Sequence, residues 1–399
     1  MEDGSAARRR TGNGLLRPMS DLLRVRPAAT PAMLAIFSDA AVIRHALRFE
    51  AALACAQAAE GLIGKGIADA IADLCGGAGI DPADLAERAT LAGTLAIPLL
   101  ALLRAELPPP AAEALHRGAT SQDLADTVLM MQVVQATALL AVDLDRVRMA
   151  LHALAELHAA TPAIGRTLLQ DAVPIGFGLR LAQAAAGVGD AGRRLEGEVA
   201  VHARVQLGGP AGSRAGLGGK GAAIAARMAG ELGLVAGVPW HANRTGVAAI
   251  AAAVGIVIGA LAKLARDISL LAQNAIGEVR EPAIPGRGGS SSMGHKRNPT
   301  GCQVALSAAI RAPGLVAAVL AALPAEEERG LGGWQAEGPA LADLFLLAAG
   351  SAAAMADVAE GLEIDEAAIA RNLAAASVVD GIGESAAIVS AILAQYRKG

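Results

Sequence analysis

The longest apolar run in the sequence, Val247 to Ala262, constrains the fold more than any other feature. It stops at Lys263 and so falls short of the roughly 20 residues that a membrane-spanning helix requires. It has no polar face, which is typical of a helix that is buried on all sides. We therefore expect other helices to surround it, from the same chain or from partner subunits.

The composition predicts that those surrounding elements are also helices. Hydrophobic residues make up 54% of the 399 residues, but aromatic residues only 2%. Ala and Leu, which dominate the apolar content, have the highest helix propensities, and the β-branched and aromatic runs that mark strands are scarce. We expect an all-α protein with more than one domain or one elongated domain.

Charge and cysteine content narrow the class of partner. A net charge of −4 offers no basic stripe, and so few aromatic residues give no platform for base stacking, which argues against nucleic acid. A small molecule is the expected ligand. The three cysteines, Cys55, Cys75 and Cys302, have no metal-ligand spacing, so we expect inert thiols in a reducing, cytoplasmic compartment.

Breaks in the apolar pattern suggest a domain organisation. An Arg-rich start without an apolar segment is not a secretory signal, so residues 1–18 are expected to form a disordered tail. An N-terminal helical domain is predicted over 19–115, a long-helix bundle over 116–340, and a C-terminal domain of two or three short helices over 341–399. Long helices are predicted at 123–161, 176–206, 221–234 and 246–277. Because several exceed the usual 11 to 12 residues and are apolar nearly all round, we expect partner subunits to cover them.

One polar segment, from Gly288 to Pro299, reads G-G-S-S-S-M-G-H-K-R-N-P. Glycines let a backbone close over a ligand, serines supply hydroxyl groups, and Lys296 with Asn298 supplies a cation and an amide for carboxylates. Composition alone is equally compatible with a flexible linker.

Two further segments precede or separate the predicted helices. The first, from His116 to Asp123, reads H-R-G-A-T-S-Q-D, in which Asp123 can cap a helix while Thr120 and Ser121 present hydroxyl groups at a helix N-terminus, a position suited to an anion. An ordinary capped helix start would look the same. The second, from Thr161 to Gln170, reads T-P-A-I-G-R-T-L-L-Q.

Together these segments resemble the fumarase/aspartase superfamily, from about Met19 to Leu373. The serine segment matches the signature G-S-S-x-M-P-x-K-x-N-P at every specified position except Gly294. The resemblance implies a long central helical bundle completed by a homotetramer with shared sites, and no metal or organic cofactor. It makes Ser290 the general base and His116 a binder or proton donor. The implied substrate-binding residues are Thr120, Ser121, Gln170, Ser291, Lys296 and Asn298.

Two departures point to a subgroup. Leu168 stands where the lyases of this superfamily keep an active-site His, and Gln303 stands where they keep the Glu that orients it. Loss of both fits a reaction whose leaving group is a carboxylate, which departs as an anion without protonation. The chain thus resembles the carboxymuconate cycloisomerases, which implies reversible lactonisation of 3-carboxy-cis,cis-muconate in protocatechuate catabolism.

Several alternatives stay open. His241 could hold a carboxylate or only pack at a helix start, and Arg329 could bind substrate or form a surface ion pair. A C–N lyase of the same fold, similar to adenylosuccinate lyase, is the first rival function, and Leu168 with Gln303 argues against it. A catalytically silent helical scaffold is the second, and the intact serine segment argues against it.

Overall fold

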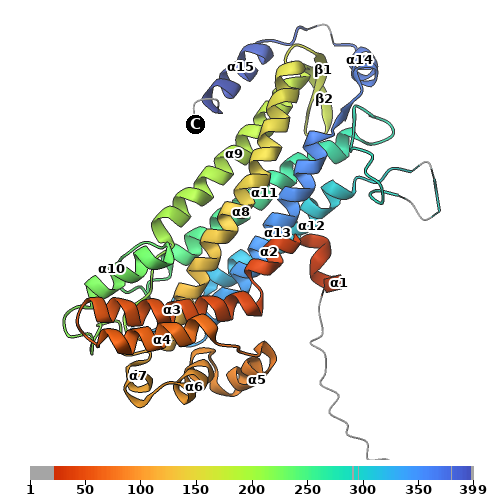
Figure 1. Cartoon of the computed structure of the whole chain (residues 1–399). Coiled ribbons are helices and arrows are strands. Elements are labelled where there is room, and N and C mark those ends of the chain that lie inside the picture. The colour runs from red at the N-terminus through yellow and green to blue at the C-terminus, as the bar shows by residue number, and fades with distance from the viewer. Residues whose placement is uncertain (1–21, 290–291, 295, 379, 397–399) are drawn as a thin grey trace, which may run out of the picture.

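The computed structural model describes residues 22–289, 292–294, 296–378 and 380–396, and long helices run side by side down its length (Figure 1). In this bundle α8 packs on α9 and α13, α11 packs on α9 and α12, and α12 packs on α13. Their shared core is mostly Ala, Leu, Val and Ile, so the all-α fold predicted from composition is confirmed. The bundle helices are α8 (Ser121–Leu157), α9 (Phe177–His202), α11 (Thr245–Leu271), α12 (Thr300–Ala321) and α13 (Gly333–Glu360).

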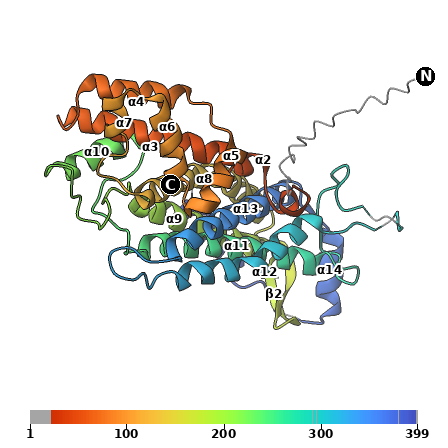
Figure 2. The same ribbon diagram turned by 90° about the horizontal axis from the view of Figure 1, so that it is seen from below.

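The N-terminal helices gather around one end of the bundle (Figure 2). There α3 packs against α4 and α10 and encloses a second apolar core, which also includes the first turns of α8. Short segments α1 (Leu22–Val25), η1 (Arg26–Ala28) and α2 (Pro31–Ile36) precede it. The helices at this end are α3 (Asp39–Ala59), α4 (Lys65–Gly77), α5 (Pro82–Ala92), α6 (Ala96–Glu106), α7 (Pro109–Ala114) and α10 (Gly221–Leu232).

The opposite end of the bundle carries small antiparallel pairs that composition did not predict. Strand β1 (Pro162–Thr167) pairs with β2 (Gln170–Gly176) in a hairpin, and β3 (Val279–Arg280) pairs with β4 (Glu363–Ile364). The last helices, α14 (Glu366–Ala375) and α15 (Ser385–Tyr396), also lie here (Figure 1). We call this the hairpin end, and the other the α8-start end.

The predicted long helices are found as α8, α9, α10 and α11, with ends a few residues from the predicted positions. The expectation of only short helices after Leu341 is wrong, because α13 runs from Gly333 through Glu360. Pro339 lies within the second turn of this helix, where its missing N–H costs one hydrogen bond, and burial of Leu341, Leu344 and Phe345 on the bundle core outweighs that loss. The helix therefore crosses residue 340, where the sequence placed a domain boundary.

Several bundle helices carry more apolar surface than the single chain buries. Among the described residues, α8, α11, α12 and α13 are each long and apolar enough to cross a membrane by length and composition; α11 qualifies because it continues beyond Lys263, where its uninterrupted apolar run stops, as far as Leu271. Only 22% of the most apolar 18-residue stretch of α12 is buried, and the side chain of Ile310 on this helix is 79% exposed. Large exposed apolar patches mark surfaces that another molecule covers.

Candidate active site

The start of α8 is built around the buried carboxylate of Asp123. One oxygen, Oδ2, accepts hydrogen bonds from the backbone N–H groups of Thr120 and Gly209, each at 2.9 Å. The other, Oδ1, accepts from the N–H of Gly208 at 2.8 Å and lies 2.7 Å from Nε2 of His241. Both oxygens are thus occupied, so Asp123 fixes the helix start and its surroundings and does not serve as a free base.

Gly208 brings the backbone close enough to make this contact. A Cβ atom at this position would lie 2.5 Å from Cε1 of His241, which no side chain can accept. The imidazole of His241 is consequently covered, and its Nδ1 has no hydrogen-bond partner among the described residues. Whether His241 binds a carboxylate stays a prediction.

The other predicted site residues at the α8-start end lie close to Thr120. Arg329, in the connection between α12 and α13, donates from Nη1 to Oγ1 of Thr120. His116 precedes the helix, and its Nδ1 lies 2.7 Å from Oε1 of Glu50 on α3. Ser121 is the first residue of α8 and is partly exposed. The structure therefore brings together His116, Thr120, Ser121 and Arg329 at the α8-start end.

Beneath these residues lies a buried ion-pair group. Arg244, directly before α11, contacts Asp126 of α8 with two hydrogen bonds of 2.8 and 2.9 Å and also pairs with Glu337 of α13. Burial raises the pKa of Glu337, although Arg244 opposes that rise. Burial alone would lower the pKa of Arg244, but the two acids raise it above its ordinary value. The guanidinium also stacks on the ring of Trp240, at 4.7 Å from its centroid.

Gln170, Lys296 and Asn298 lie at the hairpin end. Gln170 begins β2, directly after the hairpin tip, and its side chain is exposed. The segment around Lys296 and Asn298 closes on itself, because the N–H of Asn298 donates to the carbonyl of Gly288 at 2.8 Å. Ser290 and Ser291 lie outside the described residues.

The hairpin tip consists of Leu168 and Leu169, which are 97% and 75% exposed. Their φ angles of 51° and 63° fall in the left-handed region, where a side chain is strained and where Asn or Gly is usual in two-residue hairpins. Beside the tip, a cavity of about 610 Å³ is lined by Leu169, Arg166 and Arg180, among others. Both arginines form ion pairs with the buried carboxylate of Glu278.

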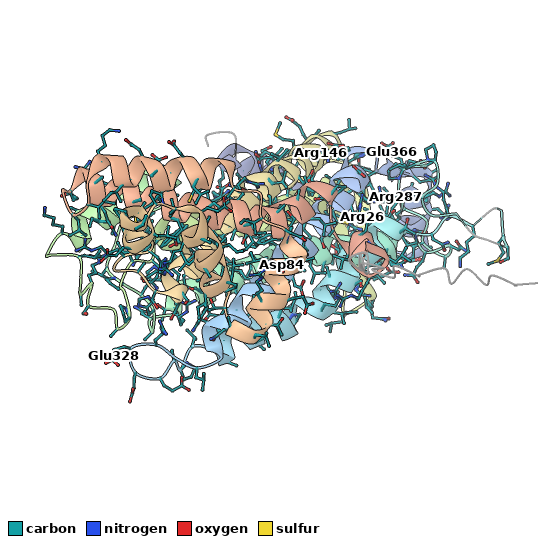
Figure 3. All side chains as sticks on the ribbon, turned by 60° about the horizontal axis from the view of Figure 1, so that its bottom comes forward. Arg26, Asp84, Arg146, Arg287, Glu328 and Glu366 are labelled. Atoms are coloured by element: carbon teal, nitrogen blue, oxygen red, sulfur yellow. The ribbon has the colours of Figure 1, made fainter. Side chains whose placement is uncertain are left out.

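Two basic side chains, one directly before the Gly288–Asn298 segment and one within it, tie this segment to the rest of the fold. Arg287 lies 3.1 Å from Asp357 of α13, and Arg297 pairs with Glu363 of β4 at 2.7 Å. Figure 3 shows Arg287 at the opposite end of the molecule from Glu328, the neighbour of Arg329. The 37 residues of α8 span roughly 55 Å at 1.5 Å per residue, so the two groups of predicted residues do not meet within one chain.

Sequence reasoning missed Glu50, Asp126 and Glu337 as parts of this arrangement. A signal for Glu50 was present, because it is an acid among the apolar positions Ala46, Leu47 and Leu53 of a predicted helix. An acid on a core-facing stripe needs a partner.

A bundle of long helices with the polar motif segments at its two ends fits the fumarase/aspartase class of enzymes, which those motifs resemble. The chain belongs to this superfamily: a family model described as "Lyase" matches residues 26–314. A 3-carboxy-cis,cis-muconate cycloisomerase of Bradyrhizobium diazoefficiens is 43% identical over 86% of this chain and 77% of its own length. A nitrosuccinate lyase of Streptomyces davaonensis is 39% identical over 90% of this chain and 77% of its own. The crystal structure of 3-carboxy-cis,cis-muconate lactonizing enzyme from Pseudomonas putida superposes with a TM-score of 0.83 and 39% identity, covering 88% of this chain and 79% of that one.

Proposed function

We propose that this protein catalyses the reversible lactonisation of 3-carboxy-cis,cis-muconate to 4-carboxymuconolactone. The supporting observation is Leu168 at the hairpin tip, where the related lyases keep an acid–base His, in a chain 43% identical to a cycloisomerase. A reaction whose leaving group in the reverse direction is a carboxylate needs no acid at that point.

In the proposed reaction a carboxylate oxygen of the substrate forms a C–O bond to a carbon of the diene. The adjacent carbon, next to another carboxylate, becomes enolate-like and takes the proton of the Ser290 hydroxyl group, and a proton from solvent water then restores that hydroxyl group. In reverse, the Ser290 alkoxide removes that proton and the C–O bond breaks. Thr120, Ser121, Lys296 and Asn298 hold the carboxylates, and their fixed dipoles favour the more negative intermediate over the ground state.

We further propose that the active enzyme is a homotetramer whose sites combine segments of different chains. Its support is that His116 and Thr120 directly precede the 37-residue α8 and Arg329 contacts Thr120, whereas Gln170 lies beyond the other end of α8, with Lys296 and Asn298 also at the hairpin end. The strained, exposed Leu168–Leu169 tip and the exposed apolar side of α12 are the surfaces that such partners would cover.

The first test is a spectrophotometric assay with carboxymuconate, in which lactonisation removes the conjugated diene and its ultraviolet absorbance. Adenylosuccinate and nitrosuccinate are run beside it, because a nitrosuccinate lyase is among the similar proteins. We expect turnover of carboxymuconate only. A well-folded protein that releases AMP or nitrite and leaves carboxymuconate unchanged would refute the proposal.

A further inference from the structure

The side chain of His116 is held by an acid to which the proposed reaction assigns no role. Glu50, on α3, lies 66 positions before His116 in the sequence, and its Oε1 is 2.7 Å from Nδ1 of the imidazole. The Glu50 side chain is fully buried, whereas that of His116 keeps 10% of its surface exposed. The pair thus has a covered acid at its base and an imidazole at its outer end.

A second contact with the same helix fixes the backbone beside His116. Gln57, also buried, donates from Nε2 to the carbonyl of Arg117 at 2.7 Å. Glu50 and Gln57 are seven residues apart, two turns of helix, and so lie on one face of α3. These two side chains fasten the His116–Arg117 segment to α3 just before α8 begins.

The backbone of His116 is strained at this point. Its φ is 63°, a left-handed conformation that costs a non-glycine residue of the order of 1 kcal/mol or more. Such a conformation persists only where the surroundings enforce it, and strain of this kind clusters at ligand sites. The contacts to Glu50 and Gln57, together with the backbone hydrogen bonds from Arg117 N–H to Ala114 and from Ala119 N–H to His116, hold this turn in place.

The charges around the imidazole favour its cationic form. Burial by itself would lower the pKa of His116, and Arg104 of α6 acts in the same direction. The carboxylate and hydrogen bond of Glu50, helped by Asp123 of α8, outweigh both, so the pKa of His116 is raised above its ordinary 6.5. With this sign, the pair stabilises the fold fully below pH 6.5 and loses its contribution as the pH rises through the raised value.

We propose that Glu50 is a positioning residue for the reaction. Its carboxylate accepts a hydrogen bond from the Nδ1–H of His116 and so directs the Nε2–H of a cationic imidazole towards a substrate carboxylate. The substrate class rests on the proposed function. The hydrogen bond fixes which ring nitrogen faces outward, and the buried carboxylate supplies the counter-charge that keeps the ring protonated.

The test measures the histidine directly and does not depend on turnover. Protein labelled with ¹³C at histidine Cε1 is titrated by NMR, and the His116 signal is assigned by its loss in His116→Gln. We expect the midpoint of His116 to lie above 6.5 in the wild type and to fall by about one pH unit or more in Glu50→Gln, where the counter-charge is gone. Glu50→Asp should fall between them. The matched control is Glu60→Gln. Glu60 lies at the end of α3 and pairs with Arg227 of α10, so its loss should leave the His116 midpoint unchanged.

The activity profile is the second measurement. We expect the alkaline limb of kcat/KM for carboxymuconate to move to lower pH in Glu50→Gln by the same amount as the NMR midpoint. At a pH above both midpoints, a midpoint that is lower by one pH unit leaves about tenfold less cationic His116, so KM should rise by about tenfold with a smaller effect on kcat.

An unchanged His116 midpoint in folded Glu50→Gln, or in Glu50→Asp if the first variant fails to fold, would overturn the inference. If the midpoint moves but no carboxymuconate is turned over by wild type, the pairing stands and the proposed substrate is wrong. If the midpoint moves while the activity profile does not, His116 is not the substrate's cation and the inference also fails.

Discussion

Ser290 carries the only proton transfer to or from the substrate in the proposed reaction, although it lies outside the described residues. We expect Ser290→Ala to lower kcat by about 10² to 10⁴, the usual contribution of a positioned acid or base. Helical content should not change, because a Gly- and Ser-rich polar segment such as Gly288 to Pro299 is not expected to supply core packing. The matched control is Ser292→Ala on the same segment, which should keep most of its activity when both variants are assayed beside wild type. If Ser290→Ala retains nearly full turnover, Ser291 becomes the candidate base.

Individual site residues could be predicted from the sequence only where they belong to a recognisable motif. The segment around Thr120 predicted a capped helix start, and it is one, but Asp123 also anchors Gly208, Gly209 and His241, which follow 85 or more positions later. Nothing in the local pattern encodes such long-range partners. For Glu50 the local pattern marks a core-facing acid, but its partner His116 becomes visible only when α3 packs beside the start of α8.

Arg244 joins elements of the bundle, because it binds acids on α8 and α13 from the start of α11. Replacement by Met leaves Asp126 and Glu337 buried without their counter-charge. We expect Arg244→Met to lower the free energy of unfolding by about 3 to 5 kcal/mol, the usual cost of removing one partner of a buried ion pair. Chemical unfolding at fixed protein concentration measures it.

The pH dependence of that loss separates electrostatics from packing. Without Arg244, burial raises the pKa of Glu337 without opposition from the guanidinium, so the variant should regain stability as the pH falls. Arg266→Met, an exposed arginine on the same helix, should change the free energy of unfolding by no more than about 0.5 kcal/mol. A loss for Arg244→Met as small as that of Arg266→Met would contradict this role.

Helices were predictable from sequence where apolar periodicity was long and uninterrupted, as in α8 and α11. Helix α13 was not predicted, because it crosses the domain boundary that was expected at residue 340 and continues through Pro339 by burial against the bundle. The β1–β2 hairpin was not predicted either. Its tip is Leu168–Leu169, which lacks the Asn-Gly or Asp-Gly pair that usually announces such a turn.

At the scale of the whole molecule, the two separated groups of site residues lead to a complementation test. Inactive His116→Ala and Ser290→Ala proteins are unfolded together and refolded as mixed tetramers. If each site takes these two residues from different chains, random assembly leaves about a quarter of the sites with both intact. Activity should reappear at up to that fraction of wild type, reduced by imperfect refolding.

Each variant refolded alone is the control, together with wild type put through the same treatment. Mixed tetramers that mass spectrometry confirms but that stay as inactive as their parents would contradict the shared site. A monomeric mass for the native protein would contradict it too, and would leave the exposed apolar side of α12 without an explanation.

The apolar exterior of the bundle also has a consequence for biosynthesis. By hydropathy, α8, α11, α12 and α13 each resemble a membrane-spanning helix. On α12, most of the apolar surface is exposed in a single chain. In the proposed tetramer, a newly made subunit that has not yet met its partners would therefore offer chaperones and membrane-insertion machinery the same features as an unfinished membrane protein. The yield of correctly assembled enzyme should then depend on how quickly nascent subunits find one another, and slow synthesis at low subunit concentration should divert more of them to degradation or inclusion bodies.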